Sequence, residues 1–284
     1  MCRLYGFSAT DVTRLDCSLV LAQNALQVQS DRDRRGQRNA DGWGIARWNG
    51  SHPDVVRSTN PAFADGAFAD EAEATRARVA LAHIRAATVG DVLAENVHPF
   101  QHGPWAFAHN GTLTAHDRLA PVLADQAHGR PRGSTDSELI FQWLLGRMPD
   151  FGLDPESPAD DANALGRLLG SAVLDLVRMS MEAPDVGPPK LNMLLSDGVN
   201  MAASRWGNSL FWTVRERLAD CAVCGTNHCP DADDSYRAVA IASEPISDEP
   251  WVEVQEGSIL VVAPNAVVTT TDLMRAAATI TNRP

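Results

Sequence analysis

The order of apolar patterns along the 284-residue chain limits its fold more than any other feature of the sequence. Strand-like runs fill both ends of the chain, and two long helical patterns lie between them. The expected strands cover residues 4–8, 44–48, 78–85, 105–109, 191–196, 201–206, 210–214, 236–242, 258–263 and 266–271, and the helices begin near residues 135 and 162. Strands, two helices and then more strands predict an α+β protein in which two stacked sheets carry helices on their outer faces.

Local signals support several of these elements. Thr135, with Glu138 three residues later, forms a capping box, so a helix is expected to begin there. Shorter helices are expected over residues 17–27 and, together with a loop, within residues 56–76, and the charged segment 30–38 is expected to be a solvated loop. No internal repeat or long linker interrupts the sequence. We therefore expect one domain over residues 1–284, the alternative being that the late strands form a small domain of their own.

The charge balance of the chain limits its partners. Lys plus Arg number 24 and Asp plus Glu number 36, which gives a net charge of −12. An acidic chain without a cluster of Lys or Arg argues against binding to nucleic acid or to anionic membrane surfaces. The apolar stretches are far shorter than the roughly 20 residues of a membrane span, and no basic-then-apolar leader opens the sequence. A cytoplasmic protein is therefore expected.

The chain opens with a cysteine directly after the initiator methionine. A small residue at position 2 favours removal of Met1, which would leave Cys2 with a free α-amine beside its thiol. Such a residue holds both a nucleophile and its base. The first seven residues alone do not favour a catalytic Cys2 over the simpler interpretation that a small residue at this position happens to be cysteine. The other motifs of the chain are needed to choose between these two interpretations.

Three other features are weak when they are taken singly. Arg85 ends a buried strand, Asn110-Gly111 has the composition of an ordinary turn, and Asp136 lies where a helix dipole favours an acid. Together with Cys2 they supply the groups that hydrolysis of a γ-glutamyl amide needs. These groups are a thiolate, a guanidinium for the α-carboxylate, a carboxylate for the α-ammonium, and a side-chain amide with a glycine N–H for the oxyanion.

Six motifs occur in an order and spacing that resemble the class II glutamine amidotransferases, the N-terminal-nucleophile hydrolases that open with a catalytic cysteine. They are Met1-Cys2-Arg3, Asp41-Gly42-Trp43-Gly44, His83-Ile84-Arg85-Ala86-Ala87-Thr88-Val89-Gly90, Asn96-Val97-His98-Pro99, His109-Asn110-Gly111 and Ser134-Thr135-Asp136-Ser137-Glu138. The resemblance implies an αββα sandwich of two mainly antiparallel sheets, which agrees with the order of elements. It also implies an enzyme, either a class II glutamine amidotransferase or a γ-glutamyl amide hydrolase.

The resemblance implies roles for the matching positions that bind and attack the substrate. Cys2 would be the nucleophile that forms a thioester, with its own α-amine as the general base. Arg85, assisted by Thr88, would bind the substrate α-carboxylate. Asp136 would bind the α-ammonium.

The resemblance also implies an oxyanion hole and a supporting layer. The side chain of Asn110 and the N–H of Gly111 would form the oxyanion hole. His83, Asn96 and His98 would brace the loops around the site. No cofactor would be required for catalysis.

Two departures from the family pattern narrow the resemblance. Ala86 and Val89 stand where many members have Trp and His, so the substrate pocket is expected to differ from that of the sugar-phosphate amidotransferases. The second half of the chain contains only further strands and no synthase domain. The chain therefore resembles small stand-alone members such as γ-glutamyl-hercynylcysteine sulfoxide hydrolase, a subgroup to which Ala242-Ser243-Glu244-Pro245 is also similar.

Three functions remain open at this point. The first is hydrolysis of glutamine or of a γ-glutamyl pathway intermediate. The second is a glutaminase subunit that delivers ammonia to a separate synthase partner. The third, a non-catalytic binding module, would require a damaged site, and none of Cys2, Arg85, Asn110, Gly111 and Asp136 is altered. The expected ligand is in each case a small γ-glutamyl molecule.

The late cysteines form a separate cluster. The chain has five cysteines, and an odd number does not suggest a secreted disulfide framework. Cys221, Cys224, His228 and Cys229 lie within nine residues, whereas a full zinc pattern has two well-separated pairs. A structural zinc is a minority expectation here, beside a Cys221–Cys229 or Cys224–Cys229 disulfide or a reduced loop. A metal that takes part in the chemistry is not expected.

Overall fold

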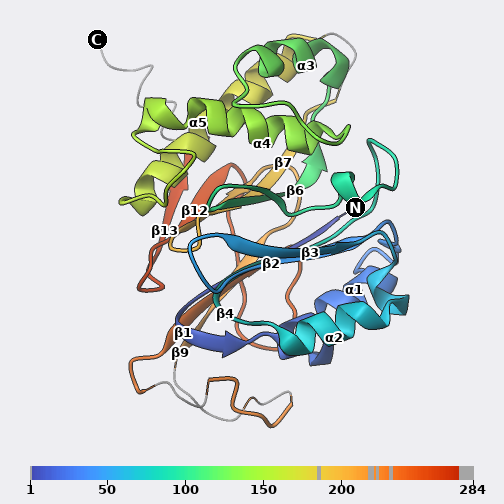
Figure 1. The fold of residues 1–284 in the computed structure, drawn as a ribbon, viewed down its shortest axis with the longest axis vertical. Helices are drawn as coiled ribbons and strands as arrows, with labels where there is room; N and C mark the ends of the chain where they lie inside the picture. The colour runs from blue at the N-terminus through green and yellow to red at the C-terminus, as the bar shows by residue number, and fades with distance from the viewer. Residues whose placement is uncertain (1, 184–186, 217–220, 222–223, 230–232, 275–284) are drawn as a thin grey trace.

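The computed structural model describes residues 2–183, 187–216, 221, 224–229 and 233–274. Within these ranges two antiparallel sheets lie face to face, and helices cover both outer faces (Figure 1). This arrangement confirms the predicted αββα sandwich. Met1, whose removal is predicted, lies outside the described residues.

The seven-stranded sheet has the order β11-β9-β10-β1-β4-β2-β3. Its central strand, β1, pairs antiparallel with β10 on one side and with β4 on the other, so that Tyr5 lies opposite Ala242 and Ala82. Strands from both ends of the chain therefore meet at β1, which begins one residue after Cys2. The strands are β1 (Arg3–Arg14), β2 (Trp43–Trp48), β3 (Pro53–Ser58), β4 (Arg76–Ile84), β9 (Phe211–Glu216), β10 (Arg237–Ala242) and β11 (Val252–Glu253).

The six-stranded sheet has the order β13-β12-β8-β7-β6-β5. It joins the two halves of the chain again, because β6 pairs antiparallel with β7 and places Asn110 opposite Asn192. The β7–β8 hairpin turns at Asp197-Gly198, as predicted, and Gly198 has the positive φ of 85° that a tight turn requires. The strands are β5 (Phe100–His102), β6 (Trp105–Thr112), β7 (Lys190–Ser196), β8 (Met201–Arg205), β12 (Ser258–Val262) and β13 (Val268–Asp272).

The helices form the two outer layers (Figure 1). One layer packs on the seven-stranded sheet and contains α1 (Leu26–Asp31) and α2 (Gly66–Ala74). The other packs on the six-stranded sheet and contains α3 (His116–Asp125), α4 (Asp136–Arg147) and α5 (Ala162–Met181). Short single-turn elements complete the described chain, namely η1 (Cys17–Leu21), η2 (Ala62–Ala64), η3 (Ala94–Asn96) and η4 (Met148–Phe151).

Apolar side chains fill the space between all four layers. Between the sheets, fully buried residues such as Leu4, Leu81, Leu194 and Leu260 pack together. Complete burial of one such side chain contributes roughly 1.5–3 kcal/mol. Because this central layer draws on strands from both halves of the sequence, neither half could bury its own sheet face alone.

The predicted helix over residues 17–27 is wrong as a continuous element. η1 ends at Leu21, the backbone is extended at Ala22, and α1 begins only at Leu26. Asn24 lies in this break, where its N–H donates to the Ile246 carbonyl and its side-chain amide donates to the Pro245 carbonyl. Tertiary hydrogen bonds to residues 245 and 246 therefore override the helical pattern.

Four elements have no counterpart among the predicted ones, namely α3, β3, β5 and β11. α3 contains Pro121 and follows Ala115 at φ 59°, and both features normally argue against a helix. β5 and β11 are three and two residues long, too short to show a strand alternation. The sequence pattern is therefore least informative where an element is short or tolerates a proline.

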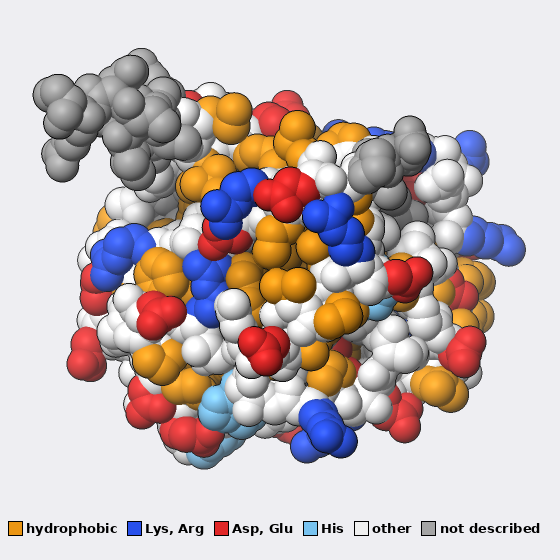
Figure 2. Space-filling view, turned by 90° about the horizontal axis from the view of Figure 1, so that it is seen from above, with side chains coloured by type: hydrophobic (Ala, Val, Ile, Leu, Met, Phe, Trp, Pro, Cys, Tyr) orange, Lys and Arg blue, Asp and Glu red, His pale blue; other side chains and the backbone are white. Residues whose placement is uncertain are grey.

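The surface over the second helical layer carries charges of both signs. Figure 2 shows that basic side chains on this face are scattered among acidic ones and do not gather into one continuous patch. Within the part of the chain that the structure describes, no helix combines the length and the apolarity that crossing a membrane would need.

Candidate active site

Cys2 lies directly before the central strand β1 and is half-buried. The backbone N–H of Ala86 donates to the Cys2 sulfur at 3.3 Å, and the thiol lies 3.4 Å from the Ala86 carbonyl oxygen. Burial raises the pKa of the Cys2 thiol, although the Ala86 N–H and the charge of Arg85 act in the opposite direction. Because the net shift is upward, this thiol needs a base before it can act as a nucleophile.

A buried ion cluster holds the backbone of residue 2. The Arg3 guanidinium donates to the Cys2 carbonyl at 2.8 Å and pairs with both Asp33 and Glu244. All three charged side chains are buried. The prediction that segment 30–38 is a solvated loop is therefore wrong at Asp33, because this carboxylate is a buried partner of Arg3.

Two cavities meet at Cys2. The first is also lined by Arg85, His98 and Asp136. The second, of about 150 Å³, is also lined by Asn110 and continues along Thr112, Lys190 and Asn208. Four residues line both cavities, namely Cys2, Ala86, Thr88 and Gly111. The structure thus brings the predicted catalytic and substrate-binding residues to one place.

Arg85 follows β4 and makes contacts that the sequence did not indicate. Its guanidinium donates to the carbonyl oxygens of Val89 at 3.1 Å, Gly90 at 3.0 Å and Asp91 at 3.0 Å. These bonds use three of the five guanidinium N–H donors. Arg85 therefore holds the loop after β4 in place, and two donors remain for a ligand.

Asp136 lies at the first position of α4, where the helix dipole favours a negative charge. One carboxylate oxygen accepts from the N–H of Leu113 at 2.7 Å, and the other accepts from the Ser137 hydroxyl at 3.3 Å. The side chain is buried. Its carboxylate therefore joins the end of β6 to the start of α4, beside Cys2.

The predicted capping box is confirmed on one side only. The Thr135 hydroxyl accepts from the N–H of Glu138 at 3.2 Å, as an N-cap residue does. The Glu138 carboxylate does not return to Thr135 but accepts from the N–H groups of Arg132 at 2.9 Å and Gly133 at 2.7 Å. Glu138 therefore orders the loop that leads into α4.

Asn110 is fixed by contacts from the second half of the chain. Its side-chain amide donates to the Ser243 hydroxyl at 3.2 Å, and that hydroxyl accepts from the N–H of Leu4 at 2.9 Å. The Asn208 amide donates to the Asn110 carbonyl at 2.9 Å. Ser243 thus ties Asn110 to the strand that begins after Cys2, and one N–H of the Asn110 amide remains for a ligand.

Gly111 has a steric reason to be glycine. A Cβ atom at this position would lie 1.8 Å from the Lys190 carbonyl oxygen and 2.5 Å from the His109 ring. No larger residue fits without moving the neighbouring strand. The pairing of β6 with β7 therefore requires glycine here. This steric requirement is independent of the predicted role of the Gly111 N–H in an oxyanion hole.

Residues 1–283 match the family profile of the class-II glutamine amidotransferases. The chain belongs to this family. A probable glutamine amidotransferase of Saccharomyces cerevisiae is 26% identical over 300 residues, which cover 94% of this chain and 83% of that protein. The γ-glutamyl-hercynylcysteine sulfoxide hydrolase of Mycobacterium tuberculosis is 30% identical over 276 residues, which cover 95% and 96%.

The solved structures agree on the fold. A glutamine aminotransferase class-II domain protein from Silicibacter pomeroyi superposes with a TM-score of 0.62 at 18% identity, over 95% of this chain and 98% of that one. Membership of the class II glutamine amidotransferases confirms both the predicted family and the prediction that the chain is an enzyme.

Two buried histidines of this amidotransferase lie beside the site, and one of them, His98, also lines the first cavity. His98 and His83 share a hydrogen bond of 3.0 Å between their ring nitrogens. Burial lowers the pKa of His83 to about 3 and lowers that of His98 well below its usual value. Both rings are therefore neutral at physiological pH, and one donates to the other.

Asn96 is the third predicted supporting residue. Its side-chain amide donates to the Asp91 carbonyl at 2.9 Å, and its side-chain oxygen accepts from the N–H of Ser134 at 2.8 Å. The loop that Arg85 holds is thereby tied to the residue before the α4 N-cap. Asn96 lies behind the cavities and not in their walls.

Replacing His83 with glutamine is expected to flatten the acid dependence of stability. The unfolded chain binds a proton at His83 below about pH 6.5, whereas the folded protein binds it only near pH 3. The stability that this neutral ring confers is fully present above that unfolded value and is lost as the pH falls, by up to about 1.4 kcal/mol per pH unit. A glutamine amide can still donate to His98 but does not titrate.

Urea unfolding at about pH 6 and pH 5 would measure this slope in the wild type and in His83→Gln. A smaller loss of unfolding free energy between the two pH values is expected in the variant. An identical loss in both proteins would show that the folded protein already carries a charged His83.

Several residues at this amidotransferase site were not predicted. His109 lies between the Ser137 hydroxyl at 2.9 Å and the Lys190 carbonyl at 2.9 Å, and both His109 and Ser137 line the first cavity. Burial lowers the pKa of His109, against the opposing charge of Asp136. His109 adjoins Asn110 and Ser137 adjoins Asp136, so both residues lie in the quoted motifs and could have been considered as site residues from the sequence. Ser243 and Glu244 lie in the late motif, which carried no assigned role.

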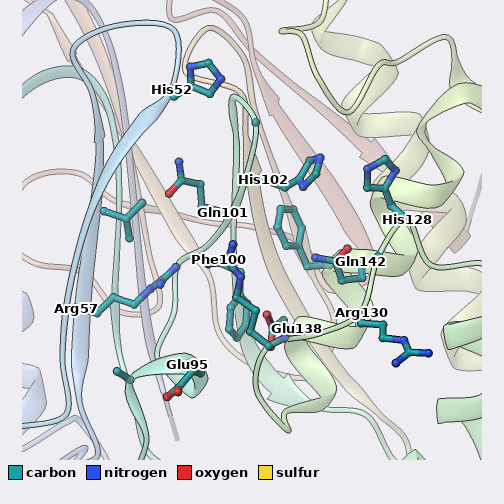
Figure 3. Close-up of a pocket in the computed structure, with 16 residues that line it drawn as sticks. His52, Arg57, Glu95, Phe100, Gln101, His102, His128, Arg130, Glu138 and Gln142 are labelled. Carbon is teal, nitrogen blue, oxygen red and sulfur yellow. Dashed lines mark hydrogen bonds between the residues drawn. The ribbon is translucent and has the colours of Figure 1, made fainter.

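A larger cavity, of about 620 Å³, lies on the other side of the first turn of α4. Figure 3 shows its polar wall, with Arg57 on one side and the rings of His102 and His128 side by side on the other. Glu138 lines this cavity, but none of the predicted catalytic or substrate-binding residues does. Size alone therefore does not locate the active site of this amidotransferase.

The late cysteine cluster differs from its predicted form. The structure brings Cys221, Cys224 and His228 together but places Cys17 beside them where the sequence suggested Cys229. The Cys229 thiol instead contacts the Val12 carbonyl at 3.1 Å. Neither of the two proposed disulfides is present in the described structure.

Proposed function

We propose that this chain hydrolyses the amide bond of a small γ-glutamyl compound through a thioester on Cys2. The observation that carries the proposal is the position of the Cys2 thiol where two cavities meet. Groups suited to a glutamyl α-carboxylate and α-ammonium line one cavity, and the Asn110 amide lines the other. Membership of the class II glutamine amidotransferases supports this chemistry.

Groups that suit the amino-acid end of the substrate line the first cavity, which is only about 20 Å³ in this structure and would have to widen to admit that end. The remaining donors of Arg85 are Nε–H and one Nη1–H, which point in different directions, so either one can donate singly to an α-carboxylate. The exposed Thr88 hydroxyl lies at the same wall. The Asp136 carboxylate uses one acceptor position on each oxygen for the protein itself, so further lone pairs remain for an α-ammonium. These contacts would fix the γ-carbonyl at Cys2.

The reaction would proceed by acyl transfer. With Met1 removed, the α-amine of Cys2 accepts the thiol proton, and the thiolate attacks the γ-carbonyl carbon. The Asn110 amide and the Gly111 N–H stabilise the oxyanion. The carbon–nitrogen bond then breaks, the amine leaves with the proton, and a thioester remains. Water attacks the thioester, which releases glutamate and restores the thiol.

The second cavity supports a leaving group larger than ammonia. Its volume of about 150 Å³ compares with roughly 30 Å³ for one water molecule in the liquid. Thr112, Lys190 and Asn208 line it, and its exposed surface is mostly apolar, which suits an amine that has both polar and apolar parts. The Mycobacterium tuberculosis relative, γ-glutamyl-hercynylcysteine sulfoxide hydrolase, supports the same substrate class.

A panel of γ-glutamyl amides would test this proposal with purified full-length protein. The panel would contain glutamine, a γ-glutamyl dipeptide and a γ-glutamyl sulfur amino acid sulfoxide, with glutamate release as the readout. A larger amide is expected to be cleaved without a partner, at a kcat/KM at least about 10-fold above that of glutamine. Each 10-fold preference corresponds to about 1.4 kcal/mol of differential transition-state binding.

The panel also separates the other functions. Turnover of glutamine alone, rising only when a synthase partner is added, would contradict the proposal and identify an ammonia-supplying subunit. A protein that binds these compounds without releasing glutamate would be a binding module. Covalent labelling of Cys2 by a glutamine-like diazo ketone would exclude that last outcome, because labelling requires a reactive thiolate.

A further inference from the structure

A second cluster of chemically reactive side chains lies far from Cys2 along the strand β1. Cys17 begins η1, shortly after the end of β1, and Cys221, Cys224 and His228 lie between β9 and β10. One ligand atom from each of these four residues lies within 4.8 Å of all the others. Segments about 200 residues apart in the sequence therefore deliver three thiols and an imidazole to one point.

The spacing of the ligand atoms suits a tetrahedral metal. The sulfurs of Cys17 and Cys221 lie 3.6 Å apart, and the Cys224 sulfur lies 3.0 Å from Nε2 of His228. Four zinc ligands at about 2.0–2.3 Å from the metal lie roughly 3.5–3.8 Å from one another. The Cys17–Cys221 distance fits this range, and the closer Cys224–His228 pair would move apart on binding. A disulfide would require a sulfur–sulfur distance of about 2.05 Å, so the Cys17–Cys221 pair is not one.

The orientation of His228 is an independent observation that points to a metal. Its Nε2 faces the thiols, while its Nδ1 lies 3.2 Å from a carboxylate oxygen of Asp16, close enough for an ion pair although not aligned for a hydrogen bond. Metal-binding histidines usually donate their second ring N–H to a carboxylate or a carbonyl, which fixes the ring. Asp16 also accepts from the N–H of Cys17 at 3.0 Å, so one carboxylate lies next to two of the four residues.

We propose that Cys17, Cys221, Cys224 and His228 bind one structural zinc ion. Three thiolates and an imidazole are ligands that zinc prefers, and four protein ligands leave no open position for chemistry. Cys17 is buried, and Cys221 and Cys224 pack against the apolar layer beneath the seven-stranded sheet. The ion would fasten the β9–β10 connection to the end of β1. This site does not depend on the proposed function of Cys2.

The proposal differs from the sequence pattern in one residue, and that residue supplies the matched control. Cys229 completes the pattern within the loop, but its thiol contacts the Val12 carbonyl at 3.1 Å and lies 3.8 Å from the Thr13 hydroxyl. It is not among the four converging residues. Cys17, 204 residues before Cys221, takes its place.

Metal analysis of the full-length protein, purified without a tag or a chelator, would test the site. Mass spectrometry of dissolved metals is expected to find about one zinc per chain. Cys17→Ser and Cys224→Ser are each expected to lower the content at least about 5-fold. Cys229→Ser and Cys2→Ala are expected to keep it, which separates this site from a loop-only site and from adventitious binding at the active-site thiol.

Cobalt provides a readout on wild-type protein in case a variant does not fold. Metal-depleted wild-type protein reconstituted with Co²⁺ is expected to show the intense visible bands of tetrahedral cobalt and a thiolate charge-transfer band. Folded wild-type protein that contains no zinc and gives neither band would overturn the proposal. So would a zinc content that falls in Cys229→Ser and not in Cys17→Ser, and so would an iron chromophore in place of zinc.

Discussion

Replacing Cys2 with alanine is expected to lower kcat/KM for γ-glutamyl amide hydrolysis by at least about 10⁴-fold, which corresponds to roughly 5.5 kcal/mol of transition-state stabilisation. Alanine removes the only atom that can form the thioester. It is also small enough at position 2 for Met1 to be removed, so processing is matched in the two proteins. Glutamate release is the measurement, and intact mass shows the state of residue 1 in both.

The same samples test the base as well as the nucleophile. Acid quenching of the wild type during turnover is expected to trap a glutamyl adduct on the N-terminal peptide, and Cys2→Ala is expected to give none. Residual activity of the variant within 10-fold of the wild type would remove Cys2 from the mechanism. Fully retained Met1 on active wild-type protein would leave the nucleophile in place but would refute the α-amine as its base.

Replacing Asp136 with asparagine is expected to lower kcat/KM for γ-glutamyl substrates by about 10²–10³-fold, because removing one partner of a desolvated charge pair costs roughly 2–5 kcal/mol. In the wild type, the Asp136 carboxylate accepts from the N–H of Leu113 at 2.7 Å. The side-chain oxygen of asparagine can still accept this hydrogen bond. The change therefore removes the charge and preserves the link between β6 and α4. Steady-state kinetics with the preferred γ-glutamyl amide would measure the loss.

A substrate without the α-amine distinguishes binding from scaffolding. Glutaric acid monoamide is expected to be a poor substrate of the wild type and to lose at most about 3-fold in Asp136→Asn, because it has no ammonium to bind. An equal loss with both substrates would make Asp136 a structural residue only. Glu138→Gln removes a carboxylate from the same helical turn that lines the larger cavity, and because it also loses one acceptor for the loop before α4, any loss it causes is expected to be equal with both substrates.

The outline of the site could be predicted because its residues lie at the ends of regular elements. Arg85 follows β4, Gly111 lies near the end of β6, and Asp136 begins α4. Their positions follow from strand and helix boundaries, which apolar patterns and capping residues mark. Pairing of β4 with β1, together with packing of the sheet that contains β6 and of α4 against it, then brings these boundaries to one end of the two sheets.

The contacts that fix the site could not be predicted, because they join segments with no local signal. Asp33 lies in a run of charged residues that has the composition of a surface loop, yet it is buried against Arg3. Ser243 contacts both Leu4 and Asn110 across more than 130 residues. Cys17 lies in an apolar segment with helical spacing, and nothing in that pattern indicates that its thiol lies beside Cys221. Only the tertiary fold places these pairs together.

The central place of β1 sets the timing of maturation. Ser243 and Glu244, which contact Leu4 and Arg3, are synthesised about 240 residues after Cys2. At about 5–20 residues per second, the start of the chain waits roughly 12–50 seconds for these partners. On the proposed mechanism, that delay is the interval in which Met1 is removed while the end of the chain is still accessible. The last strands to be made would then enclose an amine that has already been freed.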